Sequence, residues 1–370
     1  MGSYYYYTDL YSIQNNDGEI ATMFAQKGNP NITWETNANF NTGVEFGFWN
    51  GRLSGSVEYF NRKTTDMLFY FTVPTALGYD GYYSNVGDMV NQGIEIELNA
   101  DLIRTKNVKW DFNVNATHVS NKITKLADEY KTNTIDGHDG YITGNYFYAE
   151  GLPLYSYYIR ESAGVNPATG EPLWWKDVTD KAGNVVGREA TTDYSNATRY
   201  IQKTTLPKLY GGFGTSIEAY GFDASIQFTY QIGGLVYDSG YANFMDSPHD
   251  STTVGVNFHK DILNAWTPEN RNSNIPRLQY GDQYTASLSD RFLVSAAYLN
   301  IQNINAGYTF PHKWTAKAGI SKLRVYIACD NVFYWSARKG LDPRYSFQGT
   351  SNFANYSPIR TISGGVNIVF

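Results

Sequence analysis

Glu95 and Glu97 are the two residues of this sequence whose type and spacing come nearest to catalytic chemistry. On an extended strand, residues two apart share one face, with their Cα atoms about 7 Å apart. That separation falls within the range found between the acid and the base of glycosidases. Carboxylates on one face are equally common wherever a strand has a polar side. We therefore interpret the pair as lining of a polar face, and no catalytic residue is predicted.

The sequence does not predict a metal site. Asp136-Gly-His-Asp139 has only a fragment of the oxygen ligands of a cation-binding loop, and a plain turn explains it better. Cys329 is the single cysteine. The histidines lack the short, regular spacings of metal ligands; they are His118, His138, His249, His259 and His312. No cofactor is expected.

Four aromatic residues lie in what we expect to be long connections: Trp174, Trp175, Tyr241 and Phe244. Exposed aromatic rings there could stack on a sugar ring of a substrate or pack on a lid protein. Packing of one loop on another explains them equally well. We treat the four as candidate substrate or lid contacts.

The composition limits the class of protein. Aromatic residues make up 16% of the 370 residues and charged residues 17%, and the mean hydropathy is -0.43. There is no apolar run of about 18 residues, which a membrane-spanning helix would need. The net charge of -6 argues against nucleic acid as a partner.

The strongest pattern is a period-two alternation of apolar and polar residues, which predicts β-strands. It is unbroken from Phe222 to Ile232 and recurs in about nine stretches. The predicted apolar face includes Ala38, Phe40, Phe46, Ile94, Ile96, Trp110, Phe112, Ile226 and Phe228. Glu95, Glu97, Asn113 and Gln227 fall on the opposite face, so they are candidate lumen-lining residues if the sheet closes into a barrel.

One predicted strand changes parity in its middle. Leu299 and Ile301 share a face, whereas Ile304 and Ala306 continue with the opposite parity. One extra residue near Gln302-Asn303 would restore the face, which predicts a β-bulge there.

The end of the chain predicts a particular kind of strand. Ile362, Gly364, Val366, Ile368 and Phe370 share one face of a strand that finishes on an aromatic residue. Such a closing strand is typical of a bacterial outer-membrane β-barrel, and we expect it to act as the membrane-insertion signal. Short turns and long connections also alternate from Asn50-Gly51 onward, as periplasmic turns and extracellular loops do in these barrels.

Several motifs, in order along the chain, resemble those of SusC/RagA-type TonB-dependent outer-membrane transporters. They are Asn29-Pro-Asn-Ile-Thr-Trp-Glu35, Asn91-Gln-Gly-Ile-Glu95, Gly164-Val-Asn-Pro-Ala-Thr-Gly170, Trp266-Thr-Pro-Glu-Asn270, Asn303-Ile-Asn-Ala-Gly-Tyr-Thr-Phe-Pro311 and Asp330-Asn-Val-Phe333. Each motif alone is weak, but the ordered set covers the chain from about residue 29 to its end.

The resemblance implies a 22-stranded barrel in the outer membrane of a Gram-negative bacterium, plugged by an N-terminal domain. It also implies import of glycans or peptides with a SusD-like lipoprotein. Energy would come from TonB, ExbB and ExbD, acting through an N-terminal part that this sequence lacks. The expected fold is an all-β, antiparallel transmembrane β-barrel segment of about nine or ten strands. Residues 1–35 would form an extracellular loop or a poor strand, and 36–370 the C-terminal part of the barrel, without plug or signal peptide.

Two other readings use the same residues without a membrane. The chain could be a secreted or surface-attached, β-rich glycan-binding module, with the aromatic residues on its binding face. It could also be a β-sandwich glycosidase built around acidic pairs. In either case the apolar faces of the strands would pack against a second sheet.

Overall fold

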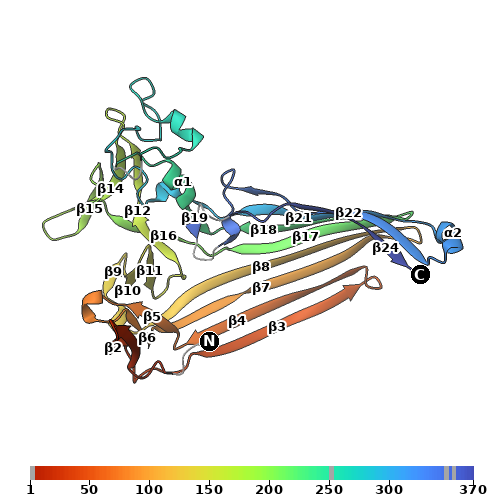
Figure 1. Ribbon diagram of the computed structural model, residues 1–370, viewed down its shortest axis with the longest axis horizontal. Helices are drawn as coiled ribbons and strands as arrows, with labels where there is room; N and C mark the ends of the chain where they lie inside the picture. The colour runs from red at the N-terminus through yellow and green to blue at the C-terminus, as the bar shows by residue number, and fades with distance from the viewer. Residues whose placement is uncertain (1–4, 250–253, 346–349, 352–355) are drawn as a thin grey trace.

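A long antiparallel sheet dominates the computed structural model, which describes residues 5–249, 254–345, 350–351 and 356–370. Within these residues the sheet has nine strands in the order β24-β22-β21-β18-β17-β8-β7-β4-β3. In chain order they are β3 (Thr36–Phe48), β4 (Leu53–Thr65), β7 (Gly87–Arg104), β8 (Val108–Leu126), β17 (Leu209–Ala219), β18 (Phe222–Ile232), β21 (Tyr298–Thr309), β22 (Lys322–Ser336) and β24 (Thr361–Val369). The sheet is curved (Figure 1), and its antiparallel order and strand number agree with the prediction.

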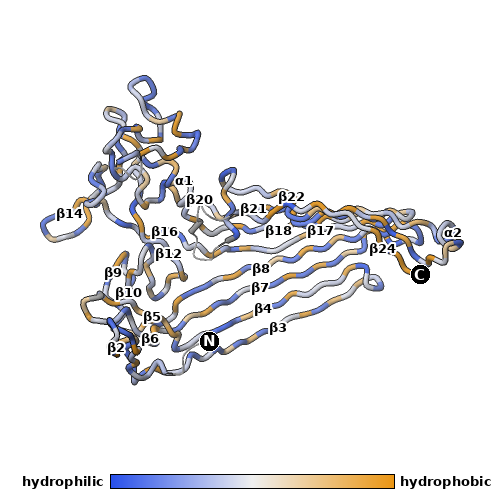
Figure 2. The backbone as a smooth tube through the Cα atoms, viewed as in Figure 1, coloured by the Kyte–Doolittle hydropathy of each residue, from blue (hydrophilic) through white to orange (hydrophobic). Residues whose placement is uncertain are grey.

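The register places the alternating residues on two distinct faces. One row of paired residues crosses six strands of the sheet. From β3 to β18 it contains Phe46, Gly55, Leu98, Val114, Phe213 and Phe228, and each of these residues is paired with the next. We call the side of this row the apolar face and the other side the polar face. Figure 2 shows the alternation along β3, β4, β7 and β8.

The predicted β-bulge is confirmed. Ile301 pairs with Phe228 and Asn303 pairs with Gln227, so Gln302 is the extra residue on β21. The pairing with β22 shifts at the same place. The bulge keeps Ile304 on the apolar face together with Ile301, as the sequence pattern required.

The two ends of the sheet differ in their connections. At one end, which we call the turn end, β3–β4, β7–β8 and β17–β18 are joined by 49–52, 105–107 and 220–221. Asn50 (φ 55°) and Gly51 (φ 78°) take the left-handed conformations expected of a tight turn. The fourth connection, 310–321, is longer than the sequence pattern suggested, since it holds α2 (His312–Thr315) and η5 (Ala316–Ala318).

At the other end, the loop end, the connections fold into a layer of their own. They contain short strands and helices, which the sequence pattern of long connections did not predict. These are β5 (Leu68–Thr72), η1 (Thr75–Leu77), β6 (Gly81–Asn85), η2 (Asp128–Tyr130), β9 (Asn133–Ile135), β10 (His138–Thr143), β11 (Tyr146–Ala149), β12 (Ser156–Arg160), β13 (Ser162–Val165), β14 (Pro172–Thr179), β15 (Val185–Thr191), β16 (Arg199–Thr204), β19 (Leu235–Asp238), α1 (Ser239–Phe244), η3 (Lys260–Asn264), η4 (Asp290–Phe292), β20 (Leu293–Ser295), η6 (Pro343–Tyr345) and β23 (Thr350–Ser351).

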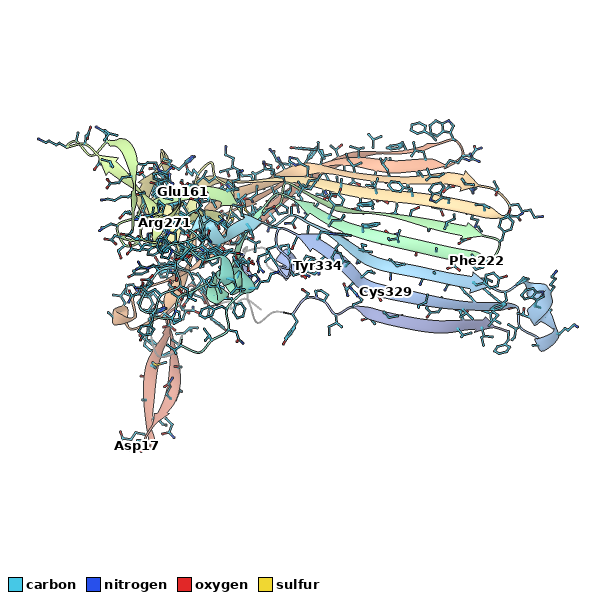
Figure 3. The ribbon with its side chains drawn as sticks, turned by 90° about the horizontal axis from the view of Figure 1, so that it is seen from above. Asp17, Glu161, Phe222, Arg271, Cys329 and Tyr334 are labelled. Atoms are coloured by element: carbon cyan, nitrogen blue, oxygen red, sulfur yellow. The ribbon has the colours of Figure 1, made fainter. Side chains whose placement is uncertain are left out.

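The N-terminal segment also has more structure than a loop. β1 (Leu10–Asn16) and β2 (Glu19–Gln26) form a hairpin, whose tip at Asp17 projects away from the rest of the molecule (Figure 3). The sequence does not predict this hairpin, because β1 and β2 both carry polar and apolar residues on each face.

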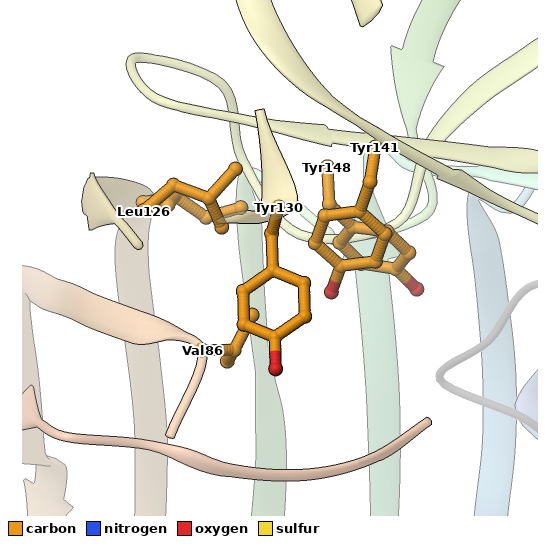
Figure 4. Close-up of a cluster of buried hydrophobic side chains, with 6 residues drawn as sticks. Val86, Leu126, Tyr130, Tyr141 and Tyr148 are labelled. Carbon is orange, nitrogen blue, oxygen red and sulfur yellow. The ribbon is translucent and has the colours of Figure 1, made fainter. Parts of the chain in front are cut away.

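Two clusters of buried hydrophobic residues lie at the loop end, one where the layer meets the long sheet and one within the layer. One cluster consists of Val86, Ile123, Leu126, Tyr130, Tyr141 and Tyr148 (Figure 4). Phe71 stacks on Tyr130 with a ring-centroid distance of 4.2 Å. A second cluster consists of Ala242, Met245 and Phe292. These clusters join segments far apart in sequence and so hold the layer over one end of the sheet.

The apolar face of the long sheet, in contrast, is open. Phe40, Val44 and Ile362 are 59%, 67% and 69% exposed. Near the turn end the aromatic residues Trp49, Tyr220, Phe222, Trp314 and Phe370 are also exposed. In the described residues, no helix is long and apolar enough to cross a membrane. The alternative of a sandwich, in which a second sheet would cover the apolar face, does not agree with these exposures.

The edges of the sheet are β3 and β24. In the described part of the chain, β3 pairs only with β4, and β24 pairs only with β22. The predicted closing residues Ile362, Val366 and Ile368 lie on the apolar face of β24, opposite Cys329, Val325 and Leu323.

Candidate functional site

The four predicted lumen-lining residues all lie on the polar face of the long sheet. Glu95 stands opposite Glu58 and Thr117, and Glu97 stands opposite Ser56 and Asn115. Glu95, Asn113 and Gln227 are half-buried, and Glu97 is exposed.

Amide side chains form a transverse row across this face. Asn113 is opposite Gly214, Gly214 is opposite Gln227, and Gln227 is opposite Asn303. A Cβ atom added at Gly214 would lie 2.0 Å from Oε1 of Gln227, so only glycine lets the Gln227 side chain lie across β17. Asn303 Nδ2 donates to Asp330 Oδ1 at 2.6 Å. The row offers hydrogen-bond donors and acceptors but little net charge.

Near the turn end, an ion-pair network ties three strands together on the same face. Arg324 of β22 donates from Nε to Oδ1 of Asp223 at 2.8 Å, and its Nη2 also donates to the second oxygen of that carboxylate. The same Nη2 donates to Oδ1 of Asn305 on β21 at 2.9 Å. A bidentate pair of this kind fixes geometry as well as adding energy.

A cavity of about 470 Å³ opens where the polar face meets the loop-end layer. The sheet contributes Asn91, Val119, Asn121, Tyr210, Gln231 and Tyr298 to its lining; the layer contributes Thr205, Leu206, Pro207, Leu235, Val236, Ala296, Pro343 and Arg344. Its mixture of apolar wall and a few amide, phenol and cationic groups is typical of a pocket for a polar organic molecule.

Hydrogen bonds fix the polar side of the cavity. Asn121 Nδ2 donates to Oδ1 of Asn91 at 2.7 Å, and Oδ1 of Asn121 accepts from the N–H of Leu154 at 2.7 Å. Gln231 Nε2 donates to the carbonyl oxygen of Ala296 at 3.2 Å. The sheet and the layer are therefore joined directly at the cavity.

Arg344 is held at the cavity wall by Asp342. The arginine Nε donates to Oδ1 of Asp342 at 2.7 Å, and the side chain of Asp342 is only 3% exposed. Burial opposes ionisation of this carboxyl, but hydrogen bonds from Arg344 outweigh it and hold the pKa of Asp342 below its usual value. The pair is therefore ionised at neutral pH, and the guanidinium is largely neutralised.

Replacing Asp342 by asparagine should destabilise the loop-end layer by about 2 kcal/mol at pH 7, because a charge-assisted hydrogen bond is lost. A carboxyl with a lowered pKa stabilises the fold above its ordinary pKa of about 4 and ceases to do so as pH falls through its folded value. The stability difference between the wild type and Asp342→Asn should therefore shrink below about pH 4. Thermal melting followed by near-UV circular dichroism of the loop tyrosines would measure it. A difference that does not change between pH 7 and pH 3 would contradict the assignment.

The candidate loop aromatics have different environments, and no site brings all four together. Trp174 is 3% exposed and packs edge-on against Tyr194, with ring centroids 5.1 Å apart, so the expectation that it is accessible was wrong. Trp175 is half-buried, with the Arg188 guanidinium 5.3 Å from its ring centroid. Of the two tryptophans, only Trp175 presents surface to a partner.

Tyr241 and Phe244 lie on α1. The Tyr241 hydroxyl donates to Oδ2 of Asp261 at 2.9 Å, and Arg338 lies 4.6 Å from its ring centroid. Burial, followed by the hydrogen bond to Asp261, raises the pKa of Tyr241 to about 12. Phe244 is 42% exposed. Tyr241 therefore has a structural role, whereas Phe244 presents an open ring.

Asp136 (φ 50°) and Gly137 (φ 77°) are left-handed and form the turn between β9 and β10, and His138 and Asp139 begin β10. The interpretation as a plain turn is correct. In the residues that the structure describes, no group of three or more His, Cys, Asp or Glu side chains could hold a metal ion.

Sequence reasoning missed the cavity. Asn91, Asn121 and Gln231 could have been found, because their parity puts them on the polar face near the ends of predicted strands. Leu235, Pro343 and Arg344 carried no such signal, since they reach the cavity from connections that the sequence pattern could not fold.

The comparisons with known proteins agree with this geometry. Residues 2–200 match the family described as TonB dependent receptor-like, beta-barrel. The TonB-dependent receptor SusC of Bacteroides thetaiotaomicron is 27% identical over 362 residues, which cover 93% of this chain and 34% of SusC. TonB-dependent receptor P3 of Formosa agariphila is 24% identical over 383 residues, covering 98% of this chain and 37% of the receptor.

Solved structures agree as well. A structure of the RagAB peptide importer in the closed-closed state superposes with a TM-score of 0.82 at 26% identity, covering 98% of this chain and 39% of that one. The open-open state gives a TM-score of 0.80 at 26% identity, covering 100% and 38%. The chain thus spans little more than a third of the length of the relatives that it matches.

Proposed function

Because this chain belongs to the TonB-dependent receptor β-barrel family, whose members are receptors and transporters rather than enzymes, we propose that it forms part of the wall of an outer-membrane importer. The observation that carries the proposal is the two-faced sheet: an open apolar face and a polar face that leads into a cavity. The apolar face would contact lipid and the polar face would line the lumen. The loop end would be extracellular and the turn end periplasmic.

The proposed cargo is a glycan or a peptide. The amide row and the cavity lining suit neutral polar groups, and Glu58, Glu95 and Glu97 on the path disfavour a strongly anionic substrate. The RagAB peptide importer, which is similar to this chain, supports the peptide class, and the motif resemblance to SusC/RagA-type transporters implies glycans as well. A SusD-like lipoprotein at the loop end would be the partner, with Trp175 and Phe244 as candidate contacts. TonB, ExbB and ExbD would supply the energy.

Filling the cavity tests the transport path. Val119→Trp introduces a bulky side chain from the polar face of β8 into the cavity lining. Because passage depends on the width of the path, uptake of a labelled oligosaccharide or peptide by cells should fall roughly tenfold. The measurement is the initial rate of uptake at equal amounts of protein in the outer-membrane fraction.

Ala116→Trp is the matched control, since Ala116 lies on the apolar face of the same strand. This variant should import at the rate of the wild type, because an apolar ring on a lipid-facing position leaves the lumen unchanged. Equal rates for the wild type and Val119→Trp would show that the cavity is not on the path.

A further inference from the structure

The apolar face changes character near the loop end of β4, β7 and β8. Lys63 stands opposite Val90, and Val90 stands opposite Lys122, so both lysines lie in one row of the apolar face. Both are exposed. One strand separates them, which sets their Cα atoms about 10 Å apart. Two flexible ammonium groups at this spacing can reach the same small anion.

Hydrogen-bonding side chains lie directly below the lysines on the same face. Asn61, Gln92 and Ser120 form the next row, each two residues along its strand from Lys63, Val90 or Lys122. Asn61 Nδ2 donates to Oε1 of Gln92 at 3.4 Å. These groups face outward from a sheet whose remaining outward residues are mostly apolar, and polar groups facing hydrocarbon are costly unless they are partnered.

This polar patch is local. On the neighbouring strands β17, β18 and β21, the same face near the loop end carries Leu209, Ile232, Tyr230 and Leu299. The sheet itself therefore does not require lysines and amides at this level, and the patch is a feature of three strands only.

The position of the patch fits the headgroup level of a bilayer. Twelve residues separate Trp110, near the turn end, from Lys122 on β8. That is about 41 Å along the strand, or about 30 Å along the membrane normal at a tilt of about 40°. With Trp110 at one interface, Lys122 lies at the opposite one, which is the outer leaflet in the proposed orientation.

The charges of the two lysines are available to a ligand. In the described part of the chain, neither Lys63 nor Lys122 forms an ion pair. The nearest carboxylate along β7 is Asp88, two residues from Val90, and its Oδ1 accepts from the N–H of Asp66 at 3.2 Å. The row thus carries two unneutralised positive charges where lipid headgroups begin.

We propose that Lys63, Lys122, Asn61, Gln92 and Ser120 form a binding site for the phosphorylated sugar headgroup of an outer-leaflet glycolipid. The two ammonium groups bind the phosphate, and the amide and hydroxyl side chains below them bind the sugar hydroxyls. The lipid chains lie along the apolar residues of β4, β7 and β8. The inference rests on the proposed membrane orientation.

Native mass spectrometry of the detergent-extracted protein tests the site, with a phosphorylated diglucosamine lipid as probe and its phosphatase-treated form for comparison. The phosphorylated lipid should bind the wild type, and Lys63→Gln/Lys122→Gln should weaken binding about 30-fold, because each lysine near a membrane surface contributes about a fivefold factor. Lys63→Arg/Lys122→Arg should retain binding. Lys181→Gln/Lys260→Gln, at exposed lysines of the loop-end layer, is the matched control and should bind as the wild type does.

Equal binding of the two lipid forms to the wild type would overturn the proposal, as would unchanged binding by the Lys63→Gln/Lys122→Gln variant. The comparison of lipid forms needs only the wild type, so it decides the matter even if that variant does not insert. Failure of the proposed function would appear differently: the wild type would be absent from the outer-membrane fraction. If the Lys63→Gln/Lys122→Gln variant loses lipid binding but inserts and imports normally, the result supports the lipid site and shows that transport does not depend on it.

Discussion

Val114→Arg should destabilise the membrane-inserted protein by about 2–4 kcal/mol, the range for arginine at the bilayer midplane on the lipid face of a barrel. Val114 lies on the apolar face of β8, between Phe112 and Ala116, and stands opposite Leu98 and Phe213. A guanidinium at this position would be transferred from water into hydrocarbon, with no carboxylate or other polar group beside it to compensate. Equilibrium unfolding in urea from phospholipid vesicles would measure the loss.

Asn113→Arg is the control for this substitution. Asn113 is the adjacent residue on β8, opposite Asn99 and Gly214 on the polar face. An arginine there reaches a wetted lumen, so the free energy of unfolding should change by less than about 1 kcal/mol. Equal losses for the two variants would contradict the assignment of the faces.

Phe292→Ala should destabilise the loop-end layer by about 3–5 kcal/mol, because it removes a fully buried aromatic ring and leaves a cavity. Phe292 is 1% exposed and contacts Tyr237 and Tyr241 edge-on at ring-centroid distances of 6.3 and 6.1 Å. Since Ala242 and Met245 belong to the same cluster, α1 should loosen first. Hydrogen exchange of the α1 amides, measured by mass spectrometry, would detect the change.

Phe244→Ala serves as the control, because Phe244 lies on α1, which packs against Phe292, but is itself 42% exposed. Its removal should change stability by less than about 0.5 kcal/mol. The strands of the long sheet should exchange normally in both variants. Faster exchange throughout the sheet in Phe292→Ala would show that the layer and the sheet unfold together.

The long strands could be predicted because their two faces meet different surroundings. Where one face contacts lipid or solvent and the other a polar interior, the period-two pattern is nearly complete, as from Phe222 to Ile232. The same reasoning located the bulge at Gln302, since one extra residue inverts every later side chain. Glu95, Asn113 and Gln227 were placed correctly on the polar face for the same reason.

The loop-end layer could not be predicted in this way. Its strands are short, and their burial depends on partners distant in sequence: Ile123 and Tyr141 share a cluster with Val86. Trp174 is buried by Tyr194, which follows a hairpin whose path the sequence pattern does not reveal. The cavity has the same origin, because Gln231 on the sheet meets Ala296 only once the layer has folded.

The central claim is that the apolar face contacts lipid while the polar face contacts water. Single cysteines introduced from Trp110 to Thr117 in a Cys329→Ser background, spin-labelled in membranes, test it most directly. Collision rates with oxygen, which concentrates in lipid, should be high at 112, 114 and 116 and low at 113, 115 and 117. A water-soluble nickel complex should give the opposite pattern. Absence of this alternation, or immobilised labels at 112, 114 and 116, would contradict the account, because it would mean that another protein surface covers the apolar face.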